Sequence, residues 1–271
     1  KLASDSKMME REFREKIGDE IVGKCQEALS RIREGIQLLV TDDISFDAFC
    51  FMNRAMIMQR NIMNFSKVYG SGVECNFTEF VDPRKPENDF GWRPFQIAFI
   101  LMNLNAIVDA NHKDREIVDL LYFPTGGGKT EAYLGLMAFV IANRRLRAND
   151  DGTYNRDGGV TAILRYTLRL LTTQQRDRIT KMVIAAELIR KKEYPKYGKE
   201  PISIGFWVGG GVTPNDFQAL KEDPEDPDKT SKARAQKKLI YKQLLTCPFC
   251  GKSLSERGIE GKEKEKEDTK D

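Results

Sequence analysis

The stretch P-T-G-G-G-K-T, residues 124–130, constrains the fold of this 271-residue chain more than any other. An apolar run, residues 115–124, leads into it, and an apolar-periodic run, residues 131–147, follows it. The first run is typical of a buried strand and the second of a helix. A glycine-rich turn between a strand and a helix is the usual setting of a phosphate-binding loop. The sequence therefore predicts a nucleotide site in an α/β fold.

The residue types of this loop suit a triphosphate. Three consecutive glycines, residues 126–128, allow a tight turn and let backbone N–H groups approach phosphate oxygens. Lys129 can reach the β- and γ-phosphates, and the Thr130 hydroxyl can hold Mg²⁺. The strict P-loop pattern would have glycine where this chain has Phe123, a departure that helicase-type loops allow. The alternative is a glycine-rich turn beside a surface lysine, but the strand–loop–helix context favours the nucleotide site.

Upstream of the loop, R-P-F-Q at residues 93–96 resembles an Arg–aromatic–Gln element of superfamily 2 helicases. The glutamine of that element reads the adenine edge, which would assign Gln96 to the base, with Phe95 or Trp92 packing beneath it. The alternative is an ordinary helix start in which Pro94 occupies the first turn and Gln96 is merely polar. With ATP and Mg²⁺ as the predicted cofactors, Lys129 and Thr130 are the candidate catalytic residues. The full set of predicted nucleotide-binding residues is Gln96, Thr125, Gly126, Gly127, Gly128, Lys129, Thr130 and Glu131.

Two later stretches are candidates for contact with a nucleic acid strand. Residues 166–175, Y-T-L-R-L-L-T-T-Q-Q, are similar to the superfamily 2 element P-T-x-x-L-x-x-Q, which touches phosphates. Residues 209–214, G-G-G-V-T-P, combine glycines that admit a backbone phosphate with a threonine that can hydrogen-bond to it. The alternatives are an ordinary amphipathic helix and a loop after an edge strand. The predicted DNA-contacting residues are Arg165, Thr167, Arg169 and Thr213.

The periodicity of the whole chain predicts alternating helices and strands after a helical start. Apolar residues at steps of three and four predict helices at residues 8–40, 46–65, 93–108, 131–147 and 168–192. Short apolar runs predict strands at residues 115–124, 160–166 and 202–210. Alternation of this kind is typical of a parallel sheet. We therefore expect a helical domain (1–85), an incomplete RecA-like α/β lobe (86–220) and a charged linker with half of a zinc knuckle (221–271).

The half knuckle is C-P-F-C-G-K, residues 247–252. A C-x-x-C turn directs two thiolates at one centre, and structural zinc needs four ligands. Cys25, Cys50 and Cys75 are isolated along the sequence, so the second ligand pair is expected beyond residue 271. The prediction is Zn²⁺ held by Cys247 and Cys250 in a complete protein; the alternative is an empty half-site.

Composition limits the binding partners and the cellular compartment that we expect for the protein. The formal charge is +3, from 44 Lys and Arg against 41 Asp and Glu, so any surface for nucleic acid must be a local patch. Five cysteines without a regular framework are typical of a reduced compartment, and we expect a cytoplasmic protein. The first residues, K-L-A-S-D-S-K, lack the core of a signal peptide, and no apolar run approaches the ~20 residues of a membrane span. Because the chain opens on Lys, we expect it to be cut from a longer protein.

Taken together, these stretches resemble one family. The phrases R-P-F-Q-I-A-F-I-L-M-N, F-P-T-G-G-G-K-T-E-A-Y-L-G-L, R-Y-T-L-R-L-L-T-T-Q-Q and G-F-W-V-G-G-G-V-T-P-N are similar to the DrmA family of helicase-like proteins of DISARM anti-phage systems. The similarity covers residues 46–250. It implies a superfamily 2 ATPase that engages DNA, works with a DrmB-like partner protein and restricts incoming phage DNA.

The chain departs from that family pattern in one important respect. A superfamily 2 motor needs an Asp–Glu pair after an apolar strand to hold Mg²⁺ and polarise water, and none follows Lys129. The acidic residues at 222–228 lack such a strand, and no second lobe is present. We therefore expect this segment alone not to hydrolyse ATP efficiently. Two other functions stay open: a different superfamily 2 restriction translocase, and a non-catalytic DNA-binding or scaffold segment.

Overall fold

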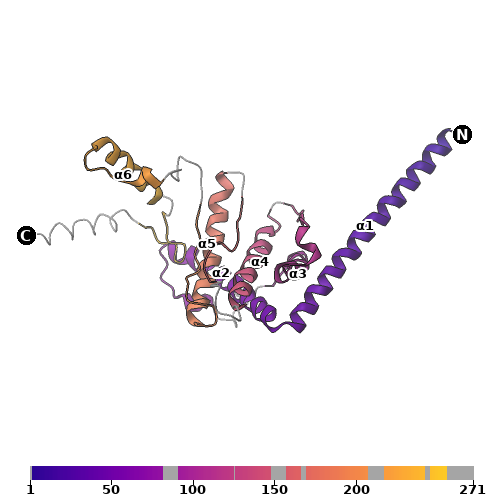
Figure 1. The fold of residues 1–271 in the computed structure, drawn as a ribbon, viewed down its shortest axis with the longest axis horizontal. Helices are drawn as coiled ribbons and strands as arrows, with labels where there is room; N and C mark the ends of the chain where they lie inside the picture. Colours follow the sequence, from indigo (N-terminus) through magenta and orange to yellow (C-terminus); the bar gives the residue numbers. More distant parts are fainter. Residues whose placement is uncertain are drawn as a thin grey trace, which may run out of the picture. The chain divides into compact units, whose positions relative to one another are not determined.

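The structure, a computed structural model, describes residues 2–81, 91–124, 126–147, 157–165, 169–206, 217–241 and 245–254. Regular structure in these residues is helical (Figure 1). The α-helices are α1 (Leu2–Thr41), α2 (Asp43–Gly70), α3 (Pro94–Val108), α4 (Lys129–Leu146), α5 (Arg169–Lys192) and α6 (Pro227–Tyr241). Single turns of 3₁₀ helix are η1 (Phe77–Phe80), η3 (Lys113–Glu116) and η4 (Phe217–Leu220).

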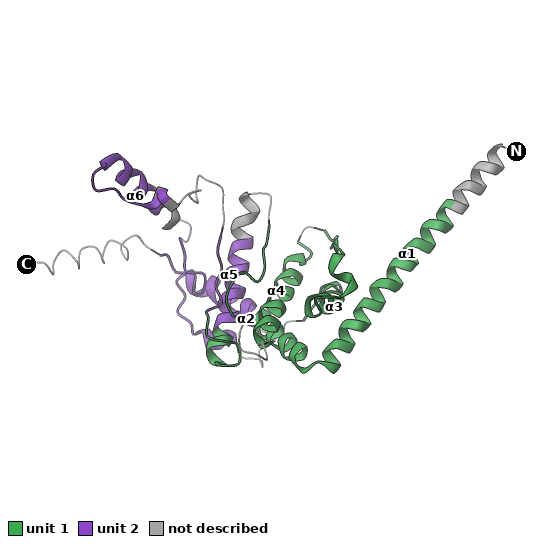
Figure 2. Cartoon of the chain, viewed as in Figure 1, with its two compact units in different colours: residues 1–57, 89–171, 188–200 green, residues 58–88, 172–187, 201–271 purple. Residues whose placement is uncertain are grey.

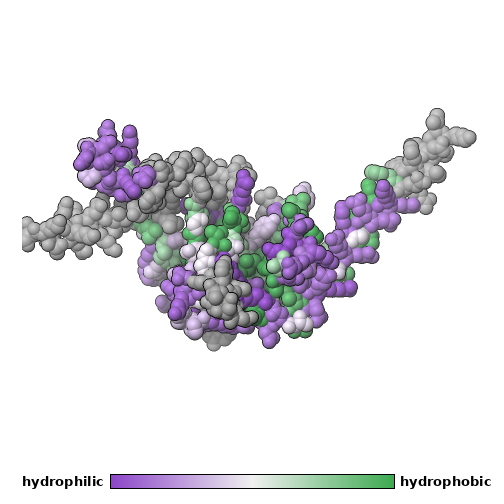
Figure 3. Space-filling view, in the orientation of Figure 1, coloured by the Kyte–Doolittle hydropathy of each residue, from purple (hydrophilic) through white to green (hydrophobic). Residues whose placement is uncertain are grey.

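The two N-terminal helices confirm the prediction made from periodicity, but they differ in burial. Residues 13–27 of α1 are exposed on every side, and in Figure 3 this part is mostly hydrophilic with separate hydrophobic side chains. The apolar residues of α2 are instead buried, among them Ala48, Phe51, Met52, Ala55, Met56, Ile62 and Phe65. Among the described residues, no helix is both long enough and apolar enough to cross a membrane.

The described chain divides into two compact units, each built from several segments (Figure 2). Unit 1 comprises residues 1–57, 89–171 and 188–200. Within it, α3 packs against both α1 and α4. At the first contact a Cβ added to Gly35 would lie 2.1 Å from the Leu101 carbonyl oxygen, so only a glycine lets the two backbones approach this closely.

Loops of unit 1 are fastened to α4 by a buried arginine. The Arg145 guanidinium donates hydrogen bonds to the carbonyl oxygens of Tyr197 (2.9 Å), Glu200 (2.7 Å) and Asp157 (3.1 Å). The Tyr197 ring is itself buried, with its centroid 4.7 Å from that of Phe51 on α2. A charged side chain with 9% exposure can stay buried here because several backbone oxygens accept from it.

Unit 2 comprises residues 58–88, 172–187 and 201–271. Its helical core draws on the C-terminal part of α2 and the middle of α5. Gln59 on α2 donates to the Arg178 carbonyl oxygen of α5 at 3.5 Å. The buried apolar side chains of these two segments are Ile62, Phe65, Ile179, Met182, Val183, Ala185 and Ala186.

The segment predicted as charged linker, residues 221–271, includes the α6 helix, which the sequence pattern did not predict. Asp226 accepts a hydrogen bond from the Lys229 N–H at 3.1 Å, and Pro227 is the first helical residue. A side-chain oxygen at the cap followed by proline is a favourable helix start. The high charge of the segment concealed this start signal. The wider division of the chain at residues 85 and 220 stays a prediction.

The predicted RecA-like parallel sheet is wrong. Residues 117–124, 160–165 and 202–206 have no regular secondary structure, although all three segments belong to predicted strands. Within the described ranges, the β-structure consists of one isolated bridge between Thr246 and Ser253. A strand exists through its hydrogen-bond ladder to a neighbour, and these segments have none. Several of their apolar side chains are exposed, by 93% at Val118 and 88% at Tyr122, although Ile202 is buried.

Candidate functional site

The glycine loop turns into the start of α4, as the sequence predicted. Gly126 and Gly128 both have left-handed backbones, with φ of 82° and 93°. The Gly127 N–H closes the turn on the Pro124 carbonyl oxygen at 3.1 Å. Gly128 is the residue before the helix, and the first N–H groups of a helix have no partner within it. A tight turn that leads into a helix N-terminus is an arrangement that can bind anions.

Lys129 folds back over this turn. Its ammonium group donates to the carbonyl oxygens of Phe123 and, at 3.2 Å, of Pro124. Both acceptors are neutral, and the side chain is partly exposed. Phosphate oxygens would bind the same ammonium group more strongly, because charge-assisted hydrogen bonds are about twice as strong as neutral ones. The lysine is thus held close to the loop by bonds that a phosphate can replace.

The start of α3 holds the loop in this shape. Gln96 is 4% exposed, and its side-chain NH₂ donates to the Gly128 carbonyl oxygen at 2.8 Å. Its side-chain oxygen accepts from the Arg93 N–H at 2.8 Å, and the Arg93 guanidinium donates to the Gly127 carbonyl oxygen at 2.6 Å. Both ends of the Gln96 amide are therefore bonded to backbone groups. Neither of the roles considered for Gln96 from sequence included this contact with the glycine loop.

Aromatic side chains dock the same two segments. The rings of Phe95 and Phe123 stack at 20° with centroids 3.9 Å apart. This contact explains why Phe123 stands where the strict pattern has glycine: its side chain attaches the loop to α3. Trp92 donates from its indole nitrogen to the Asn53 side-chain oxygen at 2.7 Å, and a Cβ at Gly135 would lie 2.6 Å from the Trp92 ring. The indole therefore packs directly on the α4 backbone.

The structure describes only some of the other predicted site residues. Thr130 and Glu131 lie in the first turn of α4, next to the loop, whereas Thr125 lies outside the described residues. Of the nucleic-acid candidates, Arg165 is exposed in a segment without regular secondary structure, and Arg169 begins α5. Thr167 and Thr213 lie outside the described residues, so the predicted contact to DNA stays a prediction.

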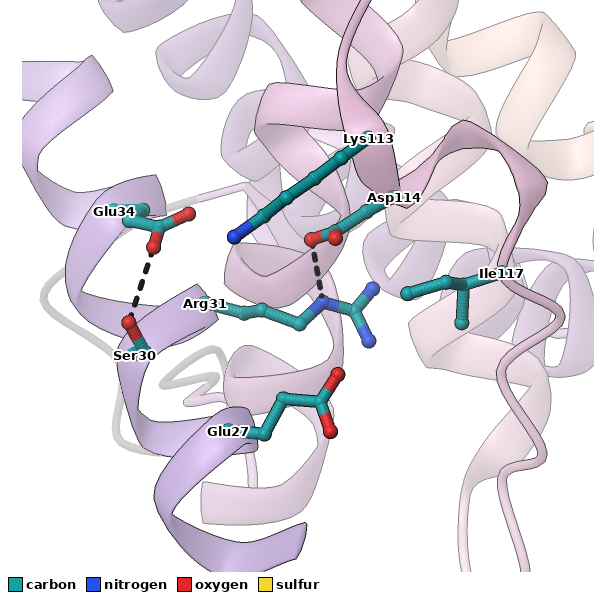
Figure 4. A pocket seen from close by; sticks show the side chains of 7 residues that line it. All are labelled: Glu27, Ser30, Arg31, Glu34, Lys113, Asp114 and Ile117. Carbon is teal, nitrogen blue, oxygen red and sulfur yellow. Dashed lines mark hydrogen bonds and ion pairs between the residues drawn. The ribbon is translucent and has the colours of Figure 1, made fainter.

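A buried charge cluster fixes the segment that leads to the glycine loop. Arg31 of α1, 7% exposed, donates to both carboxylate oxygens of Asp119 at 2.7 Å, and its Nε lies 3.0 Å from Asp114. The hydrogen bond to Asp119 raises the pKa of Arg31. Figure 4 shows Arg31 reaching from α1 toward Asp114. Sequence reasoning missed this cluster because nothing local marks two residues 88 positions apart as partners.

The same cluster lines a pocket of about 460 Å³ in unit 1. Potential ligand atoms of Glu34, His112 and Asp114, of which Glu34 and Asp114 line the pocket, lie within 4.8 Å of one another. Asp114 is already paired with Arg31, and the Lys113 side chain also lines the pocket, so the carboxylate that would have to bind a metal already has a cationic partner. This arrangement therefore gives no grounds for a metal assignment.

The cysteine knuckle, residues 245–254, forms the expected turn in unit 2. The Cys247 N–H donates to the Lys252 carbonyl oxygen, and the Gly251 N–H to the Cys247 carbonyl oxygen, both at 2.8 Å. Gly251 has a left-handed φ of 74°. Burial raises the pKa of the Cys247 thiol, but hydrogen bonds from the Cys250 and Phe249 N–H groups outweigh it and hold that pKa below its usual value. The chemistry of this turn suits a thiolate-binding metal.

Comparisons with known proteins support the resemblance seen in the motifs. No protein-family model matches the chain. The chain is 46% identical over 254 residues to a curated relative, DISARM protein DrmA of Bacillus paralicheniformis. The aligned part covers 93% of this chain and 22% of the relative, so the chain spans less than a quarter of that protein. The predicted similarity to the DrmA family is thereby confirmed along nearly the whole chain.

Proposed function

We propose that this chain carries the ATP-phosphate-binding loop of a DNA-engaging protein of an anti-phage defence system. The similarity to DISARM protein DrmA supports the defence role, and the glycine loop supports nucleotide binding. Because the chain spans 22% of that relative, ATP-driven movement along DNA would belong to the complete protein. A DrmB-like partner protein, DNA and a cytoplasmic location are parts of the same proposal.

The observation that carries the proposal is the geometry between Pro124 and Lys129. Two left-handed glycines bring the chain into a helix start, and the Lys129 ammonium group sits over the turn. On binding, this ammonium group would exchange two neutral carbonyl acceptors for phosphate oxygens. The N–H groups at the start of α4 would donate hydrogen bonds to further phosphate oxygens, and the Thr130 hydroxyl would coordinate Mg²⁺.

In this proposal the main role of Gln96 and Arg93 is to hold the glycine loop in shape. Their bonds to the Gly128 and Gly127 carbonyl oxygens hold the glycine peptides in place before the nucleotide arrives. Reading of the adenine edge by Gln96 stays a prediction, and it would require the amide to give up one of its backbone partners. Competition between ATP and GTP tests it, because an adenine-reading amide would favour ATP.

The experiment that tests the proposal is an equilibrium titration of the chain with ATP and Mg²⁺. Lys129→Ala removes the charge-assisted bonds, which are worth about 1.5–3 kcal/mol, so binding is expected to weaken by roughly 10–100-fold. Lys16→Ala is the matched control, since Lys16 is an exposed lysine on α1. Equal affinity for ATP in the two variants would contradict the assignment of the loop.

A non-catalytic DNA-binding or scaffold segment is the second candidate function. The two functions differ in the complete protein. If the loop drives a motor, Lys129→Ala abolishes protection against phage; if the segment is a scaffold, protection and DNA binding persist in that variant.

A further inference from the structure

One side of α1 carries an exposed aliphatic stripe between residues 22 and 40. Val22, Leu29 and Ile36 follow one another at intervals of seven residues and are 54%, 44% and 47% exposed. Val40, at 72% exposure, continues the stripe toward the end of the helix. An interval of seven residues returns to the same face of a helix after two turns. Aliphatic surface left in water along one face of a helix is surface that a partner can bury.

The residues between these side chains complete a heptad pattern. Cys25, Ile32 and Leu39 each stand three residues after a member of the stripe. Cys25 is exposed, whereas Ile32 and Leu39 are half-buried. Apolar residues at alternating steps of three and four form the seam along which one helix packs on another. Residues 22–39 therefore carry a helix-packing seam, called here the α1 seam.

The α3 helix packs on a neighbouring side of α1. Gly35, where an added Cβ would lie 2.1 Å from the Leu101 carbonyl oxygen, marks the side that meets α3. Arg31, which pairs with Asp114 of η3, lies about 40° from Gly35 around the helix axis, whereas Ile36 lies about 100° away on the other side. The α1 seam is thus adjacent to the contact with α3. A further helix on the seam would widen an interface that already exists.

The length of the α1 seam distinguishes a second copy of this chain from a segment of the same protein. Residues 22–39 make about two and a half heptads, and a coiled coil is normally sustained over at least ~3–4 heptads. A helix in the same polypeptide can reach an effective concentration on the order of millimolar, so a shorter seam is sufficient. This chain spans 22% of DISARM protein DrmA, so most of such a polypeptide lies outside it.

We propose that an amphipathic helix from the part of the longer protein outside this chain packs along the α1 seam. That helix presents an aliphatic heptad stripe to Val22, Leu29 and Ile36. Arg33, four residues after Leu29, is exposed beside the seam and favours an acidic residue on the facing flank of the partner helix. The contact would hold α1 in place, and α1 in turn holds the segment before the glycine loop through Arg31.

Alkylation of Cys25 tests whether the seam is covered. Cys25 is exposed in this chain and is expected to react rapidly. In the complete protein its alkylation is expected to slow by on the order of tenfold or more, because a thiol inside a helix interface is inaccessible. Gly23→Cys is the matched control, since residue 23 is exposed on the far side of α1 and trypsin separates the two sites at Lys24. Equal rates at Cys25 in the two proteins would overturn the proposal.

Sedimentation of this chain tests the alternative occupant, a second copy. The chain alone is expected to be a monomer at micromolar concentration, with Cys25 reactive. A dimer of the chain alone in which Cys25 is protected would show that a second copy covers the seam, and it would overturn the proposal.

Substitutions on the seam test the same contact through stability. Leu29→Gln combined with Ile36→Gln removes aliphatic surface but keeps good helix formers. In the complete protein the urea midpoint is expected to fall and Cys25 to become reactive. In this chain the urea midpoint is expected to stay near that of the wild type, because both side chains are already about half exposed. A complete protein with both substitutions, an unchanged midpoint and a protected Cys25 would refute the packing of a helix on this seam.

Discussion

The Gly128→Ala substitution tests whether Gln96 holds the glycine loop. The left-handed φ of 93° at Gly128 costs a residue with a Cβ about 1–2 kcal/mol. The new Cβ would also lie 2.7 Å from the Gln96 side-chain nitrogen, which must move away. That movement breaks the 2.8 Å bond to the Gly128 carbonyl oxygen and leaves a buried amide unpaired, for about 1–3 kcal/mol more. The expected total loss of unfolding free energy is about 2–5 kcal/mol.

Urea unfolding followed by circular dichroism measures this loss, and Gly126→Ala is the matched control. Gly126 has a similar left-handed φ of 82°, but a Cβ there would meet nothing within 4 Å. The control is therefore expected to lose only the backbone part, about 1–2 kcal/mol. If the two variants unfold at the same urea concentration, the contact between Gln96 and the loop does not constrain Gly128.

Packing at Gly35, the charge of Asp42 and ATP turnover by this segment can each be tested separately. Gly35→Ala places a Cβ 2.1 Å from the Leu101 carbonyl oxygen, a backbone atom, and should cost at least ~1–3 kcal/mol in urea unfolding, whereas Gly23→Ala, in open space on α1, should be neutral or stabilising. Burial raises the pKa of Asp42, but hydrogen bonds from Ser45 and Arg147 outweigh it and hold that pKa below its usual value. The resulting stability is fully present above that value and is lost as pH falls through the lowered pKa, so the difference in urea midpoint between wild type and Asp42→Asn should shrink on acidification. A phosphate-release assay with DNA should show no efficient ATP turnover by this segment, and robust turnover would mean that a water-activating carboxylate is present after all.

The helices were predictable from the sequence because their signal is local. Apolar steps of three and four residues predicted α1 and α2, and the glycines before Lys129 predicted where α4 begins. The glycine loop was likewise predictable, since a left-handed backbone needs glycine at Gly126 and Gly128 themselves. In each case the residue type and the structure it forms are at the same place in the chain.

The sheet and the supporting contacts were not predictable in the same way. An apolar segment such as residues 117–124 has strand-like composition, but a strand also needs a partner, and composition does not supply one. The contact between Gln96 and Gly128 and the pairing of Arg31 with Asp119 join residues distant in sequence. With one sequence, such pairs appear only once the fold is known.

The central claim is that the peptide nitrogens from Gly126 to Thr130 surround the phosphate tail of a nucleotide. The most direct measurement is a crystal structure of the chain with a non-hydrolysable ATP analogue and Mg²⁺. We expect phosphate oxygens about 2.7–3.2 Å from these nitrogens and from the Lys129 ammonium group, with Thr130 beside the metal. A structure in which the analogue binds elsewhere, and Lys129 keeps its bonds to the Phe123 and Pro124 carbonyl oxygens, would contradict it.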